Sequence, residues 1–314
     1  MKGHIKEVII CILSLLIIIE VGYIVKINIL NNNNAPDVNI AETNPENGAS
    51  GQEEQKYVTP VEKKVIVIDP GHGKPSSLMS AEEKTASGWV QNSSGQWGEW
   101  RHFKIGSATE NCQGTGCNGR VTPNGACWYP IGNGDRNTEP DINLQNALAA
   151  KKYLEARGYT VRMTRTTNDE NPSITRRLSY CYPDNDTTQK PDAIAFICIH
   201  SNASGGSARG TAYISAEGPY DQAWINADYV ADSNELGRIC NDKIANSTSL
   251  DISGNGIIAW EPELIAFCKS PVPCGYLEIG FFDNATDLKI LQTESDSIGK
   301  AIAEGVAEFC TVRN

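Results

Sequence analysis

The sequence predicts an α/β protein with a mostly parallel or mixed central sheet and helices on both faces. Three apolar runs, each about the length of one strand, occur at residues 65–69, 193–199 and 273–279. The first run begins with four consecutive β-branched residues, 65–68, as in strands that are buried on both faces. Segments with helical spacing of apolar residues lie between the runs, and this alternation is typical of a largely parallel sheet.

The chain divides by composition into three parts. Residues 1–30 hold an apolar run, residues 31–60 form a polar linker that begins with four asparagines, and residues 61–314 resemble one globular domain in composition. Because 40% of all residues are hydrophobic, this last part can bury an ordinary core. We therefore predict a single domain, interrupted by a long insertion at residues 74–138 after the first strand.

The N-terminal part is expected to be a signal-anchor or a signal peptide. Its apolar run covers residues 8–19 and is closer to the core of a signal peptide than to a membrane span of about 20 residues. No small-x-small cleavage site follows directly, so we favour a retained membrane anchor. Lys2 and Lys6 keep the N-terminus in the cytoplasm, so the domain is expected outside it, and secreted if the segment is cleaved.

The charge of the chain excludes one class of partner. The net charge is −11 at pH 7 and no basic run occurs, whereas nucleic-acid binding needs clustered lysines and arginines. We therefore predict no nucleic-acid partner.

Nine of the ten cysteines lie beyond the apolar run. An odd number leaves at least one thiol unpaired, and we predict Cys198 because it lies inside an apolar strand. Outside the cytoplasm, Cys112 with Cys117 and Cys268 with Cys274 are close enough in sequence to form disulfides. A cysteine zinc site is disfavoured because no CxxC pair occurs.

Strands and helices alternate along the domain. Leu144 to Leu154 have helical spacing of apolar residues with Gly158 as a C-cap, and Gly305 permits close packing of the last helix. The expected order is strand 64–69, the insertion, helix 141–157, strand 159–163, helix 173–180, strand 193–199, strand 211–215, helix 231–246, a strand ending at Glu278, and helix 297–309.

The insertion contains Trp89, Trp97, Trp100 and Trp128 among many polar residues. A structureless loop of this length is uncommon in a compact domain, so we expect short elements of its own. A small local core is the favoured role of the tryptophans, and stacking on sugar rings is the alternative.

Two histidines directly follow apolar strands. His72 comes after the first strand and His200 after the run at 193–199, where ligands of a catalytic zinc would meet at one sheet edge. A third ligand is expected, and Glu139 at the start of a helix is the favoured candidate. Glu99, Glu110 and Asp135 remain alternatives on the residues alone.

Glu278 ends the third apolar run, between apolar neighbours. Burial there disfavours the charged carboxylate unless a cation faces it, which suits a general base or acid beside a zinc ion. The alternative is a structural salt bridge from Glu278 to Arg165 or Arg177.

Five blocks of the sequence follow one another along the domain: residues 68–73 (IDPGHG), Glu139 with 143–144, 158–165, 199–203 (IHSNA) and 277–284 (LEIGFFDN). These blocks closely resemble those of the zinc-dependent N-acetylmuramoyl-L-alanine amidases, in the family's order and over about residues 64–310. The departures from the family are the long insertion, Cys181-Tyr182 where the family often has Ala-Asn, and the many cysteines.

The resemblance implies a peptidoglycan hydrolase outside the cytoplasm that cleaves the amide between N-acetylmuramic acid and the L-alanine of the stem peptide. It implies one Zn²⁺ held by His72, Glu139 and His200, with Glu278 as the catalytic carboxylate. Arg177 and Asn202 are candidate substrate-binding residues, although a structural ion pair is the favoured role of the arginine. A zinc peptidase that cuts within the stem peptide and a catalytically silent wall-binding module remain alternatives.

Overall fold

A computed structural model describes residues 64–102, 126–131, 138–216, 227–258 and 270–313. The predicted N-terminal segment at 1–30, the linker at 31–60, and Cys112, Cys117 and Cys268 lie outside these ranges. Across the described ranges, no helix combines the length and the apolar character that crossing a bilayer requires.

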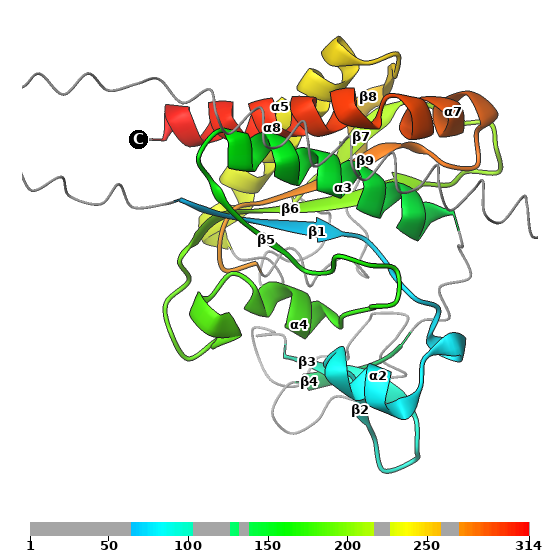
Figure 1. The fold of residues 1–314 in the computed structure, drawn as a ribbon, viewed down its shortest axis with the longest axis vertical. Coiled ribbons are helices and arrows are strands. Elements are labelled where there is room, and N and C mark those ends of the chain that lie inside the picture. The colour runs from blue at the N-terminus through cyan, green and yellow to red at the C-terminus, as the bar shows by residue number, and fades with distance from the viewer. Residues whose placement is uncertain (1–63, 103–125, 132–137, 217–226, 259–269, 314) are drawn as a thin grey trace, which may run out of the picture. The chain divides into compact units, whose positions relative to one another are not determined.

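A six-stranded mixed sheet forms the centre of the domain, as predicted (Figure 1). Its strand order is β5-β1-β6-β9-β7-β8. The first four of these strands are mutually parallel, β7 runs antiparallel to β9, and β8 is parallel to β7. The strands are β1 (Val65–Pro70), β5 (Thr160–Met163), β6 (Ala193–Asn202), β7 (Thr211–Ile214), β8 (Ile252–Ile258) and β9 (Cys274–Phe281).

Three long helices cover one face of this sheet: α3 (Glu139–Ala156), α5 (Val230–Ser247) and α8 (Ser295–Val312) (Figure 1). The larger core lies between them and the sheet, and it includes Ile66 and Ile68 of β1 with Ile197 and Ile199 of β6. Successive side chains of a strand point to opposite faces, so the intervening Val65 and Val67 belong to a second core on the other face.

The other face of the sheet carries the short helix α4 (Ile174–Ser179) and part of the insertion (Figure 1). The described part of the insertion has short elements of its own, as predicted. Trp89 is buried and donates from Nε1 to the Asn171 carbonyl at 2.7 Å, so it serves packing and not sugar stacking. The elements are a 3₁₀ turn at Ser76–Leu78, helix α2 (Ala81–Ala86) and an antiparallel sheet of β2 (Val90–Gln91), β3 (Trp97–His102) and β4 (Ala126–Pro130).

Two elements were not anticipated from the sequence. Strand β8 extends the sheet beyond β7, and the nine-residue helix α7 (Ala285–Thr293) precedes α8. Strand β8 has an irregular, largely exposed pattern with two glycines at positive φ, Gly254 and Gly256, which hides the strand signal. The Asn284 side chain caps α7 by accepting from the Thr286 and Asp287 N–H groups.

The described cysteines confirm one prediction. Cys274 is buried at the start of β9, and its predicted disulfide partner Cys268 lies outside the described ranges. Cys198 is a free buried thiol, as predicted, and its Sγ lies 3.3 Å from the Asp69 carboxylate. Cys181 and Cys240 are also buried free thiols. These cysteines lie in the two cores, where a buried thiol packs like a small apolar side chain.

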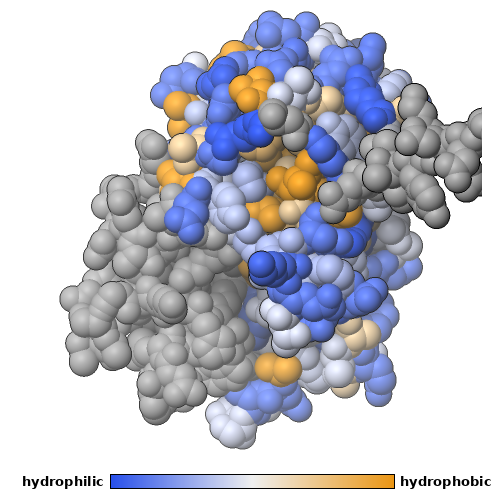
Figure 2. Space-filling view, turned by 90° about the vertical axis from the view of Figure 1, so that its left-hand side faces the viewer, coloured by the Kyte–Doolittle hydropathy of each residue, from blue (hydrophilic) through white to orange (hydrophobic). Residues whose placement is uncertain are grey.

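Hydrophobic residues at the surface are scattered. The face shown in Figure 2 is mainly hydrophilic, with hydrophobic residues in small groups. Groups of this size are usual on water-exposed protein surfaces. The large hydrophobic residues exposed in the described ranges are Leu78, Val90, Leu148, Ile252, Ile257 and Val312.

We predict that Gly305→Ala destabilises the domain although alanine favours helices. A Cβ at this position would lie 2.8 Å from the Cα and the Sγ of Cys240 in α5, so one helix backbone must move. Such overpacking costs about 1–3 kcal/mol, whereas the gain in helix propensity is about 1 kcal/mol. Chemical denaturation should show a net loss, with exposed Thr311→Ala in the same helix as the control. A more stable Gly305→Ala variant would contradict the packing argument.

Candidate metal centre

His72 lies directly beyond β1, in the turn 71–73. Its φ is +58°, a left-handed conformation that is unusual for a residue with a side chain. This turn directs the imidazole towards β6, while more than a third of the His72 side chain stays exposed. The turn therefore places a solvent-accessible imidazole at the carboxyl edge of the sheet.

His200 lies near the end of β6, the neighbour of β1. Its ring packs so closely on the turn that a Cβ at Gly71 would lie 2.3 Å from the ring atoms Cε1 and Nε2. On the other side, the ring stacks on Tyr276 of β9, with centroids 4.9 Å apart and an interplanar angle of 17°. Only glycine at position 71 leaves room for this imidazole, and Tyr276 orients it.

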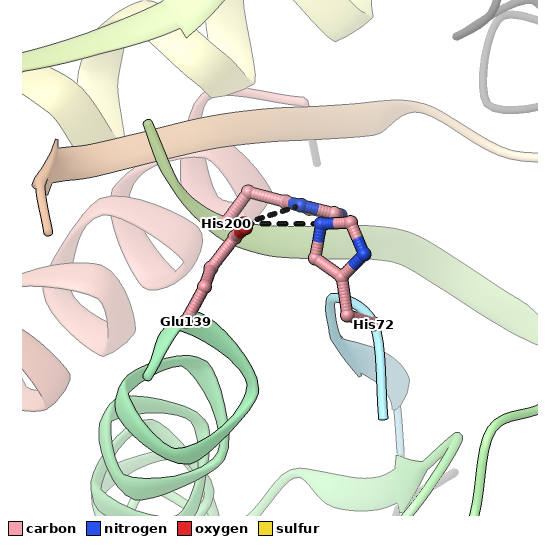
Figure 3. A group of neighbouring side chains, drawn as sticks. All are labelled: His72, Glu139 and His200. Atoms are coloured by element: carbon pink, nitrogen blue, oxygen red, sulfur yellow. Dashed lines mark hydrogen bonds and ion pairs between the residues drawn. The ribbon is translucent and has the colours of Figure 1, made fainter. Parts of the chain in front are cut away.

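Glu139 is the first residue of α3 and is almost fully buried. Its Oε1 lies 3.2 Å from His72 Nε2 and 3.1 Å from His200 Nδ1 (Figure 3). One ligand atom from each of the three residues lies within 4.8 Å of the others, so the predicted set converges.

Among the described residues, none of the alternative third ligands joins the two histidines. Glu99 lies in β3, and its carboxylate accepts from the Ile174 and Thr175 N–H groups of α4. Glu110 and Asp135 lie outside the described ranges.

The pKa shifts of Glu139 and His200 favour the forms of these two side chains that bind a metal. Burial disfavours the Glu139 carboxylate, but hydrogen bonds and charges from His200 and His72 outweigh it and hold its pKa well below the usual value. Burial lowers the pKa of His200, against the opposing effect of Glu139. A carboxylate with neutral imidazoles is the ligand form of both groups. Two nitrogens and one oxygen match the donor set of an open catalytic zinc site.

Two polar residues that the sequence did not single out as site residues support Glu139. Asn143, one helical turn along α3, donates to Glu139 Oε1 and to the Gly71 carbonyl at 3.4 Å each. The Ser201 hydroxyl donates to Asn143 Oδ1 at 2.9 Å, and its N–H donates to Glu139 Oε1 at 3.3 Å. The spacing of Glu139 and Asn143 by four residues was the available signal, because it puts both on one helix face.

Glu278 lies on β9 directly across from His200. The two residues are register partners in parallel strands, so they share one face of the sheet. The two arginines considered as its counter-ions have other partners: Arg177 pairs with Asp69 at 2.6 Å, and Arg165 donates to backbone carbonyls. Glu278 therefore lies on the same face of the sheet as His200, one strand away.

The two candidate substrate-binding residues differ in placement. Arg177 is buried, with 3% of its surface exposed, and its ion pair with Asp69 is the structural role that the sequence favoured. The neighbouring Thr164 also donates to Asp69, and these contacts keep the pKa of Asp69 low despite burial, which raises it. Asn202 is half-buried at the end of β6, and its Oδ1 accepts from the Ala203 N–H.

The chain is similar to known proteins both in sequence and in structure. The family model described as N-acetylmuramoyl-L-alanine amidase matches residues 66–308. An N-acetylmuramyl-L-alanine amidase of Mycobacterium smegmatis is similar in structure, with 20% identity, a TM-score of 0.52, and coverage of 79% of this chain and 97% of that one. The amidase catalytic domain from Bacillus (Paenibacillus) polymyxa has 20% identity, a TM-score of 0.47 and coverage of 79% and 99%. A search of curated proteins found no match.

The fold and the matched family define an amide hydrolase of the peptidoglycan-degrading class. The chain belongs to the Amidase_3 family of N-acetylmuramoyl-L-alanine amidases, because the family model covers most of its length.

We predict that Gly71→Ala disrupts the cluster while leaving the fold intact. The added methyl group would occupy the space of the His200 ring, and the ring must rotate away from Glu139. The variant should lose at least about tenfold in divalent metal affinity, as expected when a ligand is misplaced. Competition with a chromophoric chelator measures the affinity, and circular dichroism of the metal-free protein checks the fold. Unchanged affinity would show that the ring has another position available.

Proposed function

We propose that this domain hydrolyses the amide between N-acetylmuramic acid and L-alanine with one Zn²⁺ held by His72, Glu139 and His200. The observation that carries the proposal is the convergence of these three side chains at the carboxyl edge of the sheet. Parallel strands bring their carboxyl ends to one edge, where α/β proteins commonly build their sites. Membership of the amidase family supports the choice of substrate bond.

A zinc ion in such a site lowers the pKa of water and polarises a carbonyl group. The residues of the chain have two tasks around it. His72, Glu139 and His200 would hold the ion with three donors, and the partial exposure of His72 lets solvent reach the cluster. Tyr276 and Asn143 hold His200 and Glu139 in place, as partners of metal ligands generally do.

Glu278 acts as the general base and then as the general acid in this proposal. The pairing of Glu278 with His200 across neighbouring strands supports this role, because the two residues share one face of the sheet. It would accept the proton of the attacking water and return it to the nitrogen of the leaving L-alanine amine. The proton thus moves from water to the carboxylate and then to the nitrogen as the C–N bond breaks.

The first test uses purified polymeric peptidoglycan. We expect released stem peptides with a free L-alanine amine and an intact glycan strand, detected by mass spectrometry. Cleavage inside the stem peptide would show a zinc peptidase instead. Binding without cleavage by a zinc-loaded protein would show a wall-binding module.

A second test separates metal binding from proton transfer. Glu278→Gln should keep one zinc per domain but lose about 10²–10⁴-fold in kcat, because the amide cannot accept a proton. Exposed Glu155→Gln in α3 is the control and should keep wild-type activity. Zinc content is measured by atomic absorption, and near-normal turnover in Glu278→Gln would assign the base elsewhere.

His72→Ala should remove zinc binding at micromolar metal and reduce activity to background. Two remaining donors hold a divalent ion weakly, because a catalytic zinc normally has three protein ligands. If wild-type protein binds no zinc with both histidines intact, the metal-dependent mechanism fails.

We also propose that the domain works outside the cytoplasm, anchored to the bacterial cell membrane through residues 1–30. Support comes from the apolar run with Lys2 and Lys6 and from the location of peptidoglycan. A secreted form without this segment would show that the segment is cleaved as a signal peptide.

A further inference from the structure

We propose that the described part of the insertion positions the ligand His72 through two residues. Glu99 of the insertion holds the amino end of α4, and Arg177 of α4 holds the backbone around His72. That His72 binds zinc is part of the proposed function. The positioning role of Glu99 and Arg177 rests on that proposal only in the zinc-affinity measurement below. Glu99 and Arg177 are positioning residues in this scheme and do not contact substrate.

Arg177 donates hydrogen bonds to two backbone carbonyls, one just before the turn and one within it. Its Nη1 donates to the Pro70 carbonyl at 3.0 Å, and its Nη2 donates to the His72 carbonyl at 2.7 Å. The ion pair with Asp69, the residue before Pro70, fixes the guanidinium at 2.6 Å. Planar guanidinium groups make such paired hydrogen bonds with defined geometry, and both charges are almost fully buried.

The backbone of His72 needs this support. A left-handed φ is unfavourable for a residue with a Cβ and persists only where the surroundings hold it. Arg165 adds bonds to the Pro70 and Gly71 carbonyls at 2.9 and 2.8 Å. Arg177 is the one of these two arginines that bonds to the carbonyl of His72 itself, so a shift of Arg177 moves the peptide that carries the ligand.

Glu99 connects the insertion to α4. Its Oε1 accepts from the Ile174 N–H at 3.1 Å, and its Oε2 accepts from the Thr175 N–H at 2.9 Å. These are two of the first N–H groups of the helix, which lack partners within it, and a negative charge is favourable there. Because α4 has only six residues, contacts from outside determine where its first turn lies. Glu99 is 3% exposed, so water does not replace these bonds easily.

Further bonds attach the insertion to the segment that leads into α4. The Lys74 N–H donates to the Glu170 carbonyl at 3.0 Å, and the Asn171 side chain donates back to the Lys74 carbonyl at 3.0 Å. The Ser173 N–H donates to the Ser87 carbonyl at 2.9 Å. The described part of the insertion and the segment 170–177 are therefore joined by several hydrogen bonds, and this segment contacts the turn of His72.

The experiment compares two variants with two matched controls in the full chain. Glu99→Gln keeps the shape of the side chain but puts an amide donor against a helix N–H group. Arg177→Lys keeps the charge opposite Asp69 but loses the planar fork. Arg162→Lys is the control for the arginine, because Arg162 also pairs with an aspartate, Asp192, and donates to carbonyls after α4. Glu294→Gln is the control for the glutamate, because its carboxylate accepts from the Ser249 N–H.

The first readout is hydrogen exchange of the metal-free proteins in the peptide that spans residues 68–76. The Gly71 N–H bonds to Ile199 and the Lys74 N–H bonds to Glu170, so both amides should be protected in the wild type. Exchange should become at least about fivefold faster in Glu99→Gln and Arg177→Lys, and stay within about twofold in both controls. Circular dichroism at the assay temperature ensures that only folded variants are compared.

The second readout is zinc affinity by chelator competition. It should fall about tenfold in Glu99→Gln and Arg177→Lys, the effect typical of disturbing a contact that orients a ligand, and stay unchanged in the controls. Wild-type exchange and affinity in folded Glu99→Gln would overturn the inference. Should wild-type protein bind no zinc, the proposed function fails, while hydrogen exchange of the metal-free proteins still decides the inference.

Discussion

The buried ion pair between Asp69 and Arg177 is the interaction on which the rest of the site depends. It joins the end of β1 to α4 across the face of the sheet that carries the cluster. Removing one partner of such a pair leaves an uncompensated buried charge and costs about 3–5 kcal/mol. The same guanidinium holds the carbonyls of Pro70 and His72, so the charge pair and the turn are one structural unit.

The cluster draws its three side chains from three different elements: the turn after β1, the start of α3 and the end of β6. Parallel pairing of β1 with β6 brings the two histidines to one edge, and α3 crosses that edge with Glu139 in its first turn. The neighbouring strand β9 adds Glu278 to the same face. Tyr276 packs against His200, and Asn143 donates to Glu139, which suits a preorganised site.

The described part of the insertion contacts the segment that supports the turn of His72. It interrupts the chain between His72 and Glu139, and its Glu99 and Trp89 bond to the segment that carries α4. The insertion separates His72 from Glu139 in sequence, although His72 Nε2 lies 3.2 Å from Glu139 Oε1. Ordering a long segment costs conformational entropy, and contacts such as these offset that cost.

The sequence by itself determined the α/β class, the strand ends with His72, His200 and Glu278, and the helix that begins at Glu139, because apolar runs and the residues that end them are local signals. Only the tertiary structure decided that β7 and β8 run antiparallel to the other four strands, that Glu99 caps α4, and that Arg177 is buried beside Asp69. These features depend on which distant segments meet. Hydrogen-bond partners more than 70 residues apart, such as Glu99 and Ile174, leave no periodicity that one sequence can display.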